Sequence, residues 1–145
     1  MTIAMPGSYA DSLDRTARQT RQSLQVSCAI GKQQVLGELS EVYGECRTEG
    51  WDGYGALPVE QDTMRLAYCL IDSLPYGFPM PSIGAEPDGH LTLEWQTGPY
   101  RILSVSVDPE GYLHFAGIYG TDRQNGRLTF YSTAPTELIQ LVRRL

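Results

Sequence analysis

The sequence predicts an α+β fold, because the spacing of its hydrophobic residues changes twice along the chain. In the first half, apolar residues recur at intervals of three and four, as on one face of a helix. From about residue 82 to residue 131 they alternate with polar residues, as in half-buried strands, and near the C-terminus helical spacing returns. We therefore expect two N-terminal helices, a four- to five-stranded antiparallel meander and a C-terminal helix, with the helices packed on one sheet face.

Two helices are expected before the sheet. The first runs from about Lys32 to Thr48, and Gly50 provides its stop. The second spans about Val59 to Leu74 and is ended by Pro75. The apolar face of the first consists of Val35, Leu36, Leu39, Val42, Tyr43 and Cys46.

The strands are separated by residues that favour turns. We expect strands at 91–96, 103–107, 112–119 and 128–131, with a further short strand at 82–86. The segment Asp108 to Gly111 is typical of a turn, and Asn125-Gly126 is expected to form a hairpin turn. In the final helix, Thr133 is the expected N-cap and Pro135 lies in the first turn.

Residues 1–30 differ from the rest of the chain, which we interpret as one α+β domain over residues 31–145. They are rich in Ser, Thr, Gln and Arg, and only Leu13, Ala17 and Leu24 give a thin apolar stripe. A weak helix or a mobile arm is expected. The alternative is an arm that docks on a partner.

The composition excludes several classes of function. The net charge is −6, and acidic residues outnumber basic ones between Gly31 and Thr97, so we expect no direct binding of nucleic acid. The chain has no apolar run long enough to cross a bilayer and no basic-then-apolar start, so we expect a cytoplasmic protein without membrane contact. The three cysteines are widely spaced and predict neither a disulfide framework nor a zinc site; Cys46 and Cys69 are expected to be buried thiols.

No motif for catalysis, for a cofactor or for a metal stands out. His90 and His114 lie in or beside strands without a nucleophile motif, and His114 is expected on the polar face of its strand. Asp52 is surrounded by glycines and aromatic residues, but binding of backbone amides or capping of the next helix explains it without chemistry. We therefore expect no cofactor.

The segment from Trp51 to Pro58 is the most distinctive stretch of the chain. Its glycines and proline require an irregular backbone, and Trp51 and Tyr54 are expected to bury their rings. We interpret the loop as a folded connector between two helices, with a binding loop as the alternative. The acidic residues Glu38, Glu41 and Glu45 form a stripe on the first strong helix, and this stripe together with Trp51, Asp52 and Tyr54 is our candidate interaction surface.

These stretches resemble an uncharacterised family of small bacterial hypothetical proteins. The similarity rests on the W-D-G-x-G-A-x-P loop from Trp51 to Pro58, on D-G-x-x-x-L-E-W from Asp88 to Trp95, and on L-S-V-S-V from Leu103 to Val107. It covers roughly residues 36–116 and implies a bacterial origin. Such short genes often lie on mobile elements or beside toxin–antitoxin and defence loci.

Three hypotheses for the function follow. The first is a non-catalytic protein-interaction module with an accessory, antitoxin-like or inhibitory role and an unidentified protein partner, with a homodimer as one arrangement. The second is a small-molecule or enzymatic site near the Trp51–Tyr54 loop, in a pocket holding Asp52 and at least one of His90 and His114. The third is an inhibitor whose acidic surface replaces nucleic acid on its partner.

Overall fold

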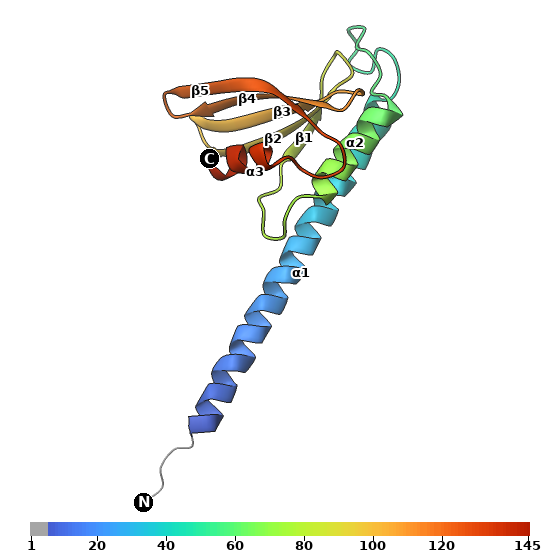
Figure 1. The fold of residues 1–145 in the computed structure, drawn as a ribbon. Helices are drawn as coiled ribbons and strands as arrows, with labels where there is room; N and C mark the ends of the chain where they lie inside the picture. The colour runs from blue at the N-terminus through green and yellow to red at the C-terminus, as the bar shows by residue number, and fades with distance from the viewer. Residues whose placement is uncertain (1–5) are drawn as a thin grey trace, which may run out of the picture.

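The computed structural model describes the backbone of residues 6–145, and the side chains of residues 12–19 and 31–145. Three helices and five strands lie in this part of the chain (Figure 1). They are α1 (Pro6–Cys46), α2 (Gln61–Asp72), β1 (Ser82–Ala85), β2 (Leu91–Gly98), β3 (Arg101–Val107), β4 (Tyr112–Tyr119), β5 (Asp122–Thr129) and α3 (Thr136–Arg143). The α+β fold expected from the sequence is confirmed.

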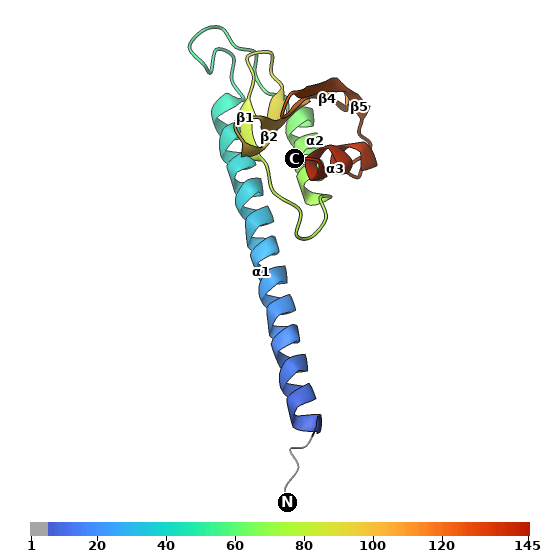
Figure 2. The same ribbon diagram turned by 90° about the vertical axis from the view of Figure 1, so that its left-hand side faces the viewer.

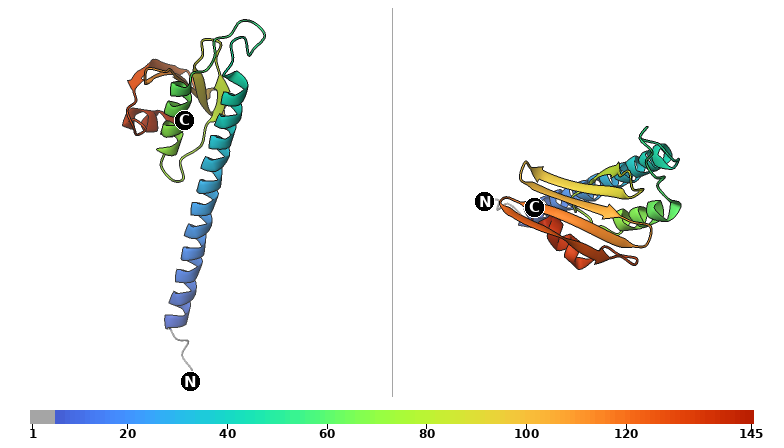
Figure 3. Two further views of the ribbon diagram at one scale, coloured as in Figure 1. Left: turned by 90° about the vertical axis from the view of Figure 1, so that its right-hand side faces the viewer. Right: turned by 90° about the horizontal axis from the view of Figure 1, so that it is seen from above.

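The five strands form one antiparallel sheet in the order β1-β2-β3-β4-β5, so that each strand pairs with its neighbour in sequence. The register places Thr92, Ser106 and His114 side by side on β2, β3 and β4. The three helices cover one face of the sheet, and the other face is open (Figure 3). This meander agrees with the alternation seen in the sequence.

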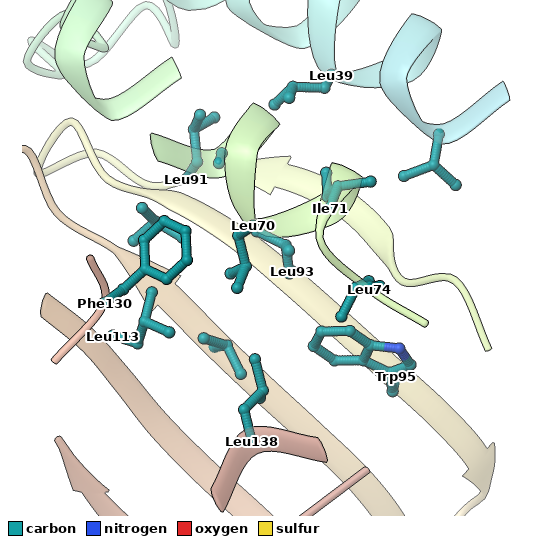
Figure 4. Close-up of a cluster of buried hydrophobic side chains, with 14 of the residues drawn as sticks. Leu39, Leu70, Ile71, Leu74, Leu91, Leu93, Trp95, Leu113, Phe130 and Leu138 are labelled. Carbon is teal, nitrogen blue, oxygen red and sulfur yellow. The ribbon is translucent and has the colours of Figure 1, made fainter. Parts of the chain in front are cut away.

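The core lies between the sheet and the helices (Figure 4). Leu39 of α1, Leu70 and Ile71 of α2, and Leu138 of α3 are fully buried there. The sheet contributes every second residue of its central strands, because side chains alternate across a strand. These residues are Leu91, Leu93, Trp95, Leu103, Val105, Val107 and Leu113.

Helix α1 begins at Pro6 rather than near Lys32, so it is much longer than expected. It continues without a break through residue 30 and projects away from the sheet (Figures 1 and 2). Side chains 12–19 are exposed, whereas Val35, Leu39 and Cys46 are buried against the body. The expected arm is thus helical from Pro6 on; its first five residues and the side chain of Leu24 lie outside the described residues.

Lys32 lies where α1 joins the body. Its Nζ donates hydrogen bonds to the carbonyl oxygens of Asp72 (2.8 Å) and Leu74 (2.9 Å), at the end of α2. These carbonyls have no partner further along the helix, and a cation is favoured at this end of the helix dipole. The chain's only lysine therefore ties the two helices together.

Two expectations for the second half of the sheet were wrong. The fifth strand spans Asp122–Thr129 rather than residues 128–131, and Asn125-Gly126 lies inside it. The hairpin turns at Gly120-Thr121, where Gly120 has a φ of 71°. Gly126 instead faces Phe115 on β4, and an added Cβ there would lie 2.9 Å from the Phe115 ring, so the glycine leaves room for that ring.

Two other details also differ from expectation. Helix α3 has Pro135 as its N-cap, without a side-chain cap, so Thr133 is not the N-cap. Cys46 is buried as expected, but Cys69 is exposed because it falls on the solvent side of α2. Among the described residues, no helix is both long and apolar enough to cross a membrane.

Candidate functional site

The loop from Trp51 to Pro58 folds back on the end of α1. The amide of Gly50 donates to the carbonyl oxygen of Ala56 (2.8 Å), and the amide of Val59 donates to that of Cys46 (2.9 Å). The indole Nε1 of Trp51 donates to the carbonyl oxygen of Leu57 (2.9 Å), and its half-buried ring packs against the core. The expected folded connector is therefore present.

Asp52 holds the tip of this loop. Its Oδ1 accepts hydrogen bonds from the backbone amides of Tyr54 (2.8 Å) and Ala56 (3.0 Å). This confirms the expected bonding to backbone amides. The alternative role as a helix cap is wrong, because α2 has Glu60 at its N-cap and no side-chain cap.

Tyr54 does not bury its ring as expected. Its side chain is 93% exposed, because the turn held by Asp52 points it into solvent. Gly53 and Gly55 on either side have φ values of 79° and 81°, which L-amino acids rarely adopt. A large aromatic ring is thus presented to solvent by a backbone with little freedom.

The acidic stripe lies on the exposed side of α1. Glu38, Glu41 and Glu45 are all exposed, and none of them forms an ion pair among the described residues. Because Glu45 lies one residue before the end of α1, the stripe leads toward the Trp51–Pro58 loop at that end of the helix (Figure 1). All six residues predicted from sequence lie in the described part of the chain: the stripe runs along the last turns of α1, and the loop that carries the other three follows the end of that helix.

The open face of the sheet carries a polar cluster that the sequence analysis missed. The rings of His90 and His114 stack with centroids 6.1 Å apart and planes 12° apart. Ser106 Oγ lies 3.2 Å from His90 Nδ1, and Asp108 Oδ2 lies 2.9 Å from His114 Nε2. His114 is on the polar face as expected. The alternation of Thr92, Ser106 and His114 with buried residues could have revealed this row once the register was known.

Asp108 is the most constrained carboxylate of the cluster. Its residue is 7% exposed, and its Oδ1 accepts hydrogen bonds from the amides of Glu110 (2.8 Å) and Tyr112 (3.0 Å). Burial acts to raise the pKa of Asp108, but the hydrogen bonds from His114, Tyr112 and Glu110 outweigh it. The pKa of this carboxyl is therefore lowered below its ordinary value, and Asp108 is ionised at neutral pH.

The turn between β1 and β2 brings a second polar group to the same face. The amide of His90 donates to Asp88 Oδ1 (3.0 Å), and Thr92 Oγ1 donates to Glu86 Oε1. Leu57 of the Trp51–Pro58 loop donates its amide to the carbonyl oxygen of Pro87 (2.8 Å). The loop and this turn therefore support each other.

None of three surface hollows in the described part of the chain is lined by Asp52 or by a histidine, as the expected pocket would be. A hollow of 550 Å³ lies between α1 and α2, where Tyr43, Met64 and Tyr68 line it. Other hollows lie along β3 to β5 and beside α3. Asp52 lines none of these three. The two histidines lie together on the open sheet face, so a chemical site would be centred there.

Comparison of the chain with family models, with curated proteins and with solved structures found no match.

Proposed function

We propose that this chain is a non-catalytic protein-interaction module that binds a basic protein through Tyr54 and the acidic stripe. The observation that carries the proposal is the 93% exposed ring of Tyr54 on a loop fixed by Asp52. Tyrosine is enriched among the residues that contribute most to protein interfaces. Because Asp52 fixes the backbone at Tyr54, a partner that covers the ring has to order only the side chain.

The acidic stripe determines the kind of partner. Glu38, Glu41 and Glu45 are exposed without a basic partner among the described residues, and the whole chain carries a net charge of −6. A surface of one sign attracts the opposite sign and speeds association. A partner with a basic face would therefore meet the stripe while one of its pockets takes Tyr54.

The biological setting is part of the same proposal. We place the protein in the bacterial cytoplasm, as an accessory, antitoxin-like or inhibitory protein of a mobile-element or defence locus. The resemblance of the motifs around Trp51, Asp88 and Leu103 to small bacterial proteins supports this setting. The negative charge of the chain would also suit a partner whose basic surface otherwise binds nucleic acid.

The second candidate is a small-molecule or enzymatic site. The stacked pair of His90 and His114, with Asp108 fixing one ring, is the observation that favours it. A carboxylate that orients an imidazole is a common feature of active sites. This candidate predicts that a metabolite, rather than a protein, changes the chemical shifts of both histidines.

The test is an affinity pull-down of the tagged full chain from lysate of a bacterial host, with bound proteins identified and bound nucleic acid quantified. The recovered partner is then measured against the wild type, against Tyr54→Ala and against the triple variant Glu38→Lys, Glu41→Lys, Glu45→Lys. We expect Tyr54→Ala to speed dissociation and the triple variant to slow association. Loss of nucleic acid by the partner on binding would support the inhibitor form of the proposal.

Matched variants separate these effects from general ones. Tyr131→Ala removes a tyrosine that is 87% exposed on another part of the surface. The triple change Asp72→Lys, Glu110→Lys, Glu137→Lys alters the net charge by the same amount at other exposed positions. If these controls weaken binding as much as the test variants do, the proposed surface is wrong.

A further inference from the structure

The turn that joins β1 to β2 gathers three metal-ligating side chains. Glu86, Asp88 and His90 occur at alternate positions, and one ligand atom from each lies within 4.8 Å of the other two. Ligand atoms about 2.0–2.2 Å from one ion in a tetrahedral arrangement lie about 3.3–3.6 Å apart, so the side chains must close by up to about 1.5 Å when they bind. Glu86 and His90 are half-buried, and Asp88 is exposed, which leaves one side open to solvent.

The backbone of the turn is held firmly. Glu86 donates its amide to the carbonyl oxygen of His90 (2.9 Å), and Gly89 donates to that of Glu86 (2.9 Å). Gly89 has a φ of 89° and is buried against Pro58. Ligands carried by a rigid backbone lose less freedom on binding an ion than ligands on a mobile loop.

Neighbouring hydroxyl groups orient two of the three side chains. Thr92 Oγ1 donates to Glu86 Oε1, and Ser106 Oγ lies 3.2 Å from His90 Nδ1. Asp88 Oδ2 lies 3.4 Å from the same nitrogen of His90. The Thr92 hydroxyl is an outer partner of the kind that fixes the direction of a ligating carboxylate, whereas an ion bound at His90 Nδ1 would replace the Ser106 contact. The imidazole and both carboxylates therefore converge on one region of the sheet face.

We propose that Glu86, Asp88 and His90 form a binding site for one divalent transition-metal ion. The set of one imidazole nitrogen and two carboxylates suits Zn²⁺ or Co²⁺ better than Mg²⁺ or Ca²⁺, which prefer oxygen ligands alone. Three protein ligands leave at least one position for water or for a group from another molecule. The ion also offsets the repulsion between the two carboxylates.

The test is a titration of the full chain with Zn²⁺ by isothermal calorimetry, and with Co²⁺ by visible absorption. Both use the Cys69→Ser background, because an exposed thiol such as that of Cys69 can bind Zn²⁺ by itself. We expect one ion per chain, a rise in the unfolding temperature with Zn²⁺, and no saturation with Mg²⁺. His90→Ala, Asp88→Asn and Glu86→Gln are each expected to weaken binding about tenfold or more, as the loss even of an outer partner can.

Glu137→Gln is the control, since it neutralises an exposed carboxylate on α3 that belongs to none of the proposed ligands. It is expected to leave the affinity unchanged. Absence of saturable Zn²⁺ and Co²⁺ binding in the Cys69→Ser chain would overturn the proposal. So would His90→Ala or both carboxylate variants binding as tightly as their parent. Circular dichroism of each variant checks that a loss of binding is not a loss of fold.

Discussion

An added Cβ at Gly89 would lie 2.8 Å from the carbonyl oxygen of Pro58. This close approach, together with the hydrogen bond from Leu57 to Pro87, locks the Trp51–Pro58 loop onto the β1–β2 turn. The stretch from Trp51 to Pro58 and the stretch that begins at Asp88 therefore pack directly on each other.

Gly89→Ala is therefore expected to destabilise the fold strongly. The new methyl group must move the backbone of Pro58, and the φ of 89° is itself strained for alanine. A residue held in a sparsely populated backbone region costs about 1–3 kcal/mol. Urea unfolding should show a loss of unfolding free energy above that range.

Gly120→Ala is the control, since its φ of 71° is also positive but no atom lies within 4 Å of the added Cβ. Equal losses in the two variants would show that the contact with Pro58 has no effect.

Trp51→Ala and Tyr54→Ala should differ strongly in their effect on the free energy of unfolding, although both residues lie in the same loop. The half-buried Trp51 ring packs on the core and donates to Leu57, so we expect a loss of about 3 kcal/mol, at the low end for a buried aromatic. Tyr54→Ala should change the free energy of unfolding by less than about 0.5 kcal/mol, because its side chain is exposed. Chemical denaturation measures both. A large loss for Tyr54→Ala would mean that the ring packs on the protein, and it would weaken the case for a binding surface.

The sequence predicted the elements that depend on local spacing and missed those that depend on contacts between distant residues. Alternation located β2, β3 and β4, because the buried residues of a central strand must face the core. It fails for β5, an edge strand whose residues are mostly exposed, so the sequence pattern alone predicts a turn at Asn125-Gly126 instead of a strand. The glycine at 126 makes room for Phe115 on another strand.

In the candidate site, too, local contacts can be predicted from the sequence and contacts between distant residues cannot. Asp52 binding to nearby amides could be inferred locally, since both acceptor contacts lie within four residues. The exposure of Tyr54 could not, because it depends on which side of the loop packs on the core. The stacking of His90 on His114 depends on the register of β2, β3 and β4, which the sequence does not state.

The pair formed by Asp108 and His114 should make stability depend on pH in the acidic range. The pKa of Asp108 is lowered in the folded protein, so its contribution is fully present above the unfolded pKa of about 3.9. That contribution is lost as the pH falls through the lower, folded-state pKa. The difference in unfolding free energy between the wild type and Asp108→Asn should therefore shrink below about pH 4. Asp62→Asn, at an exposed surface ion pair, is the control and should show little change. A difference that does not vary with pH would contradict the assignment.

Thr63→Val is expected to stabilise the protein. Thr63 is fully buried in α2, and its Oγ1 has no hydrogen-bond partner among the described residues. A buried hydroxyl without a partner costs about 1–3 kcal/mol, whereas valine has nearly the same shape and a similar helix propensity. We expect a gain of about 1 kcal/mol in the free energy of unfolding, measured with urea.

Ser73→Ala is the matched contrast, because the Ser73 Oγ donates to the Leu70 carbonyl (2.8 Å) and accepts from the Ala134 amide (2.9 Å). Its loss should destabilise the fold by about 1 kcal/mol or more. If Thr63→Val destabilises the protein instead, the Thr63 hydroxyl has a hydrogen-bond partner, such as a bound water, and the prediction is wrong.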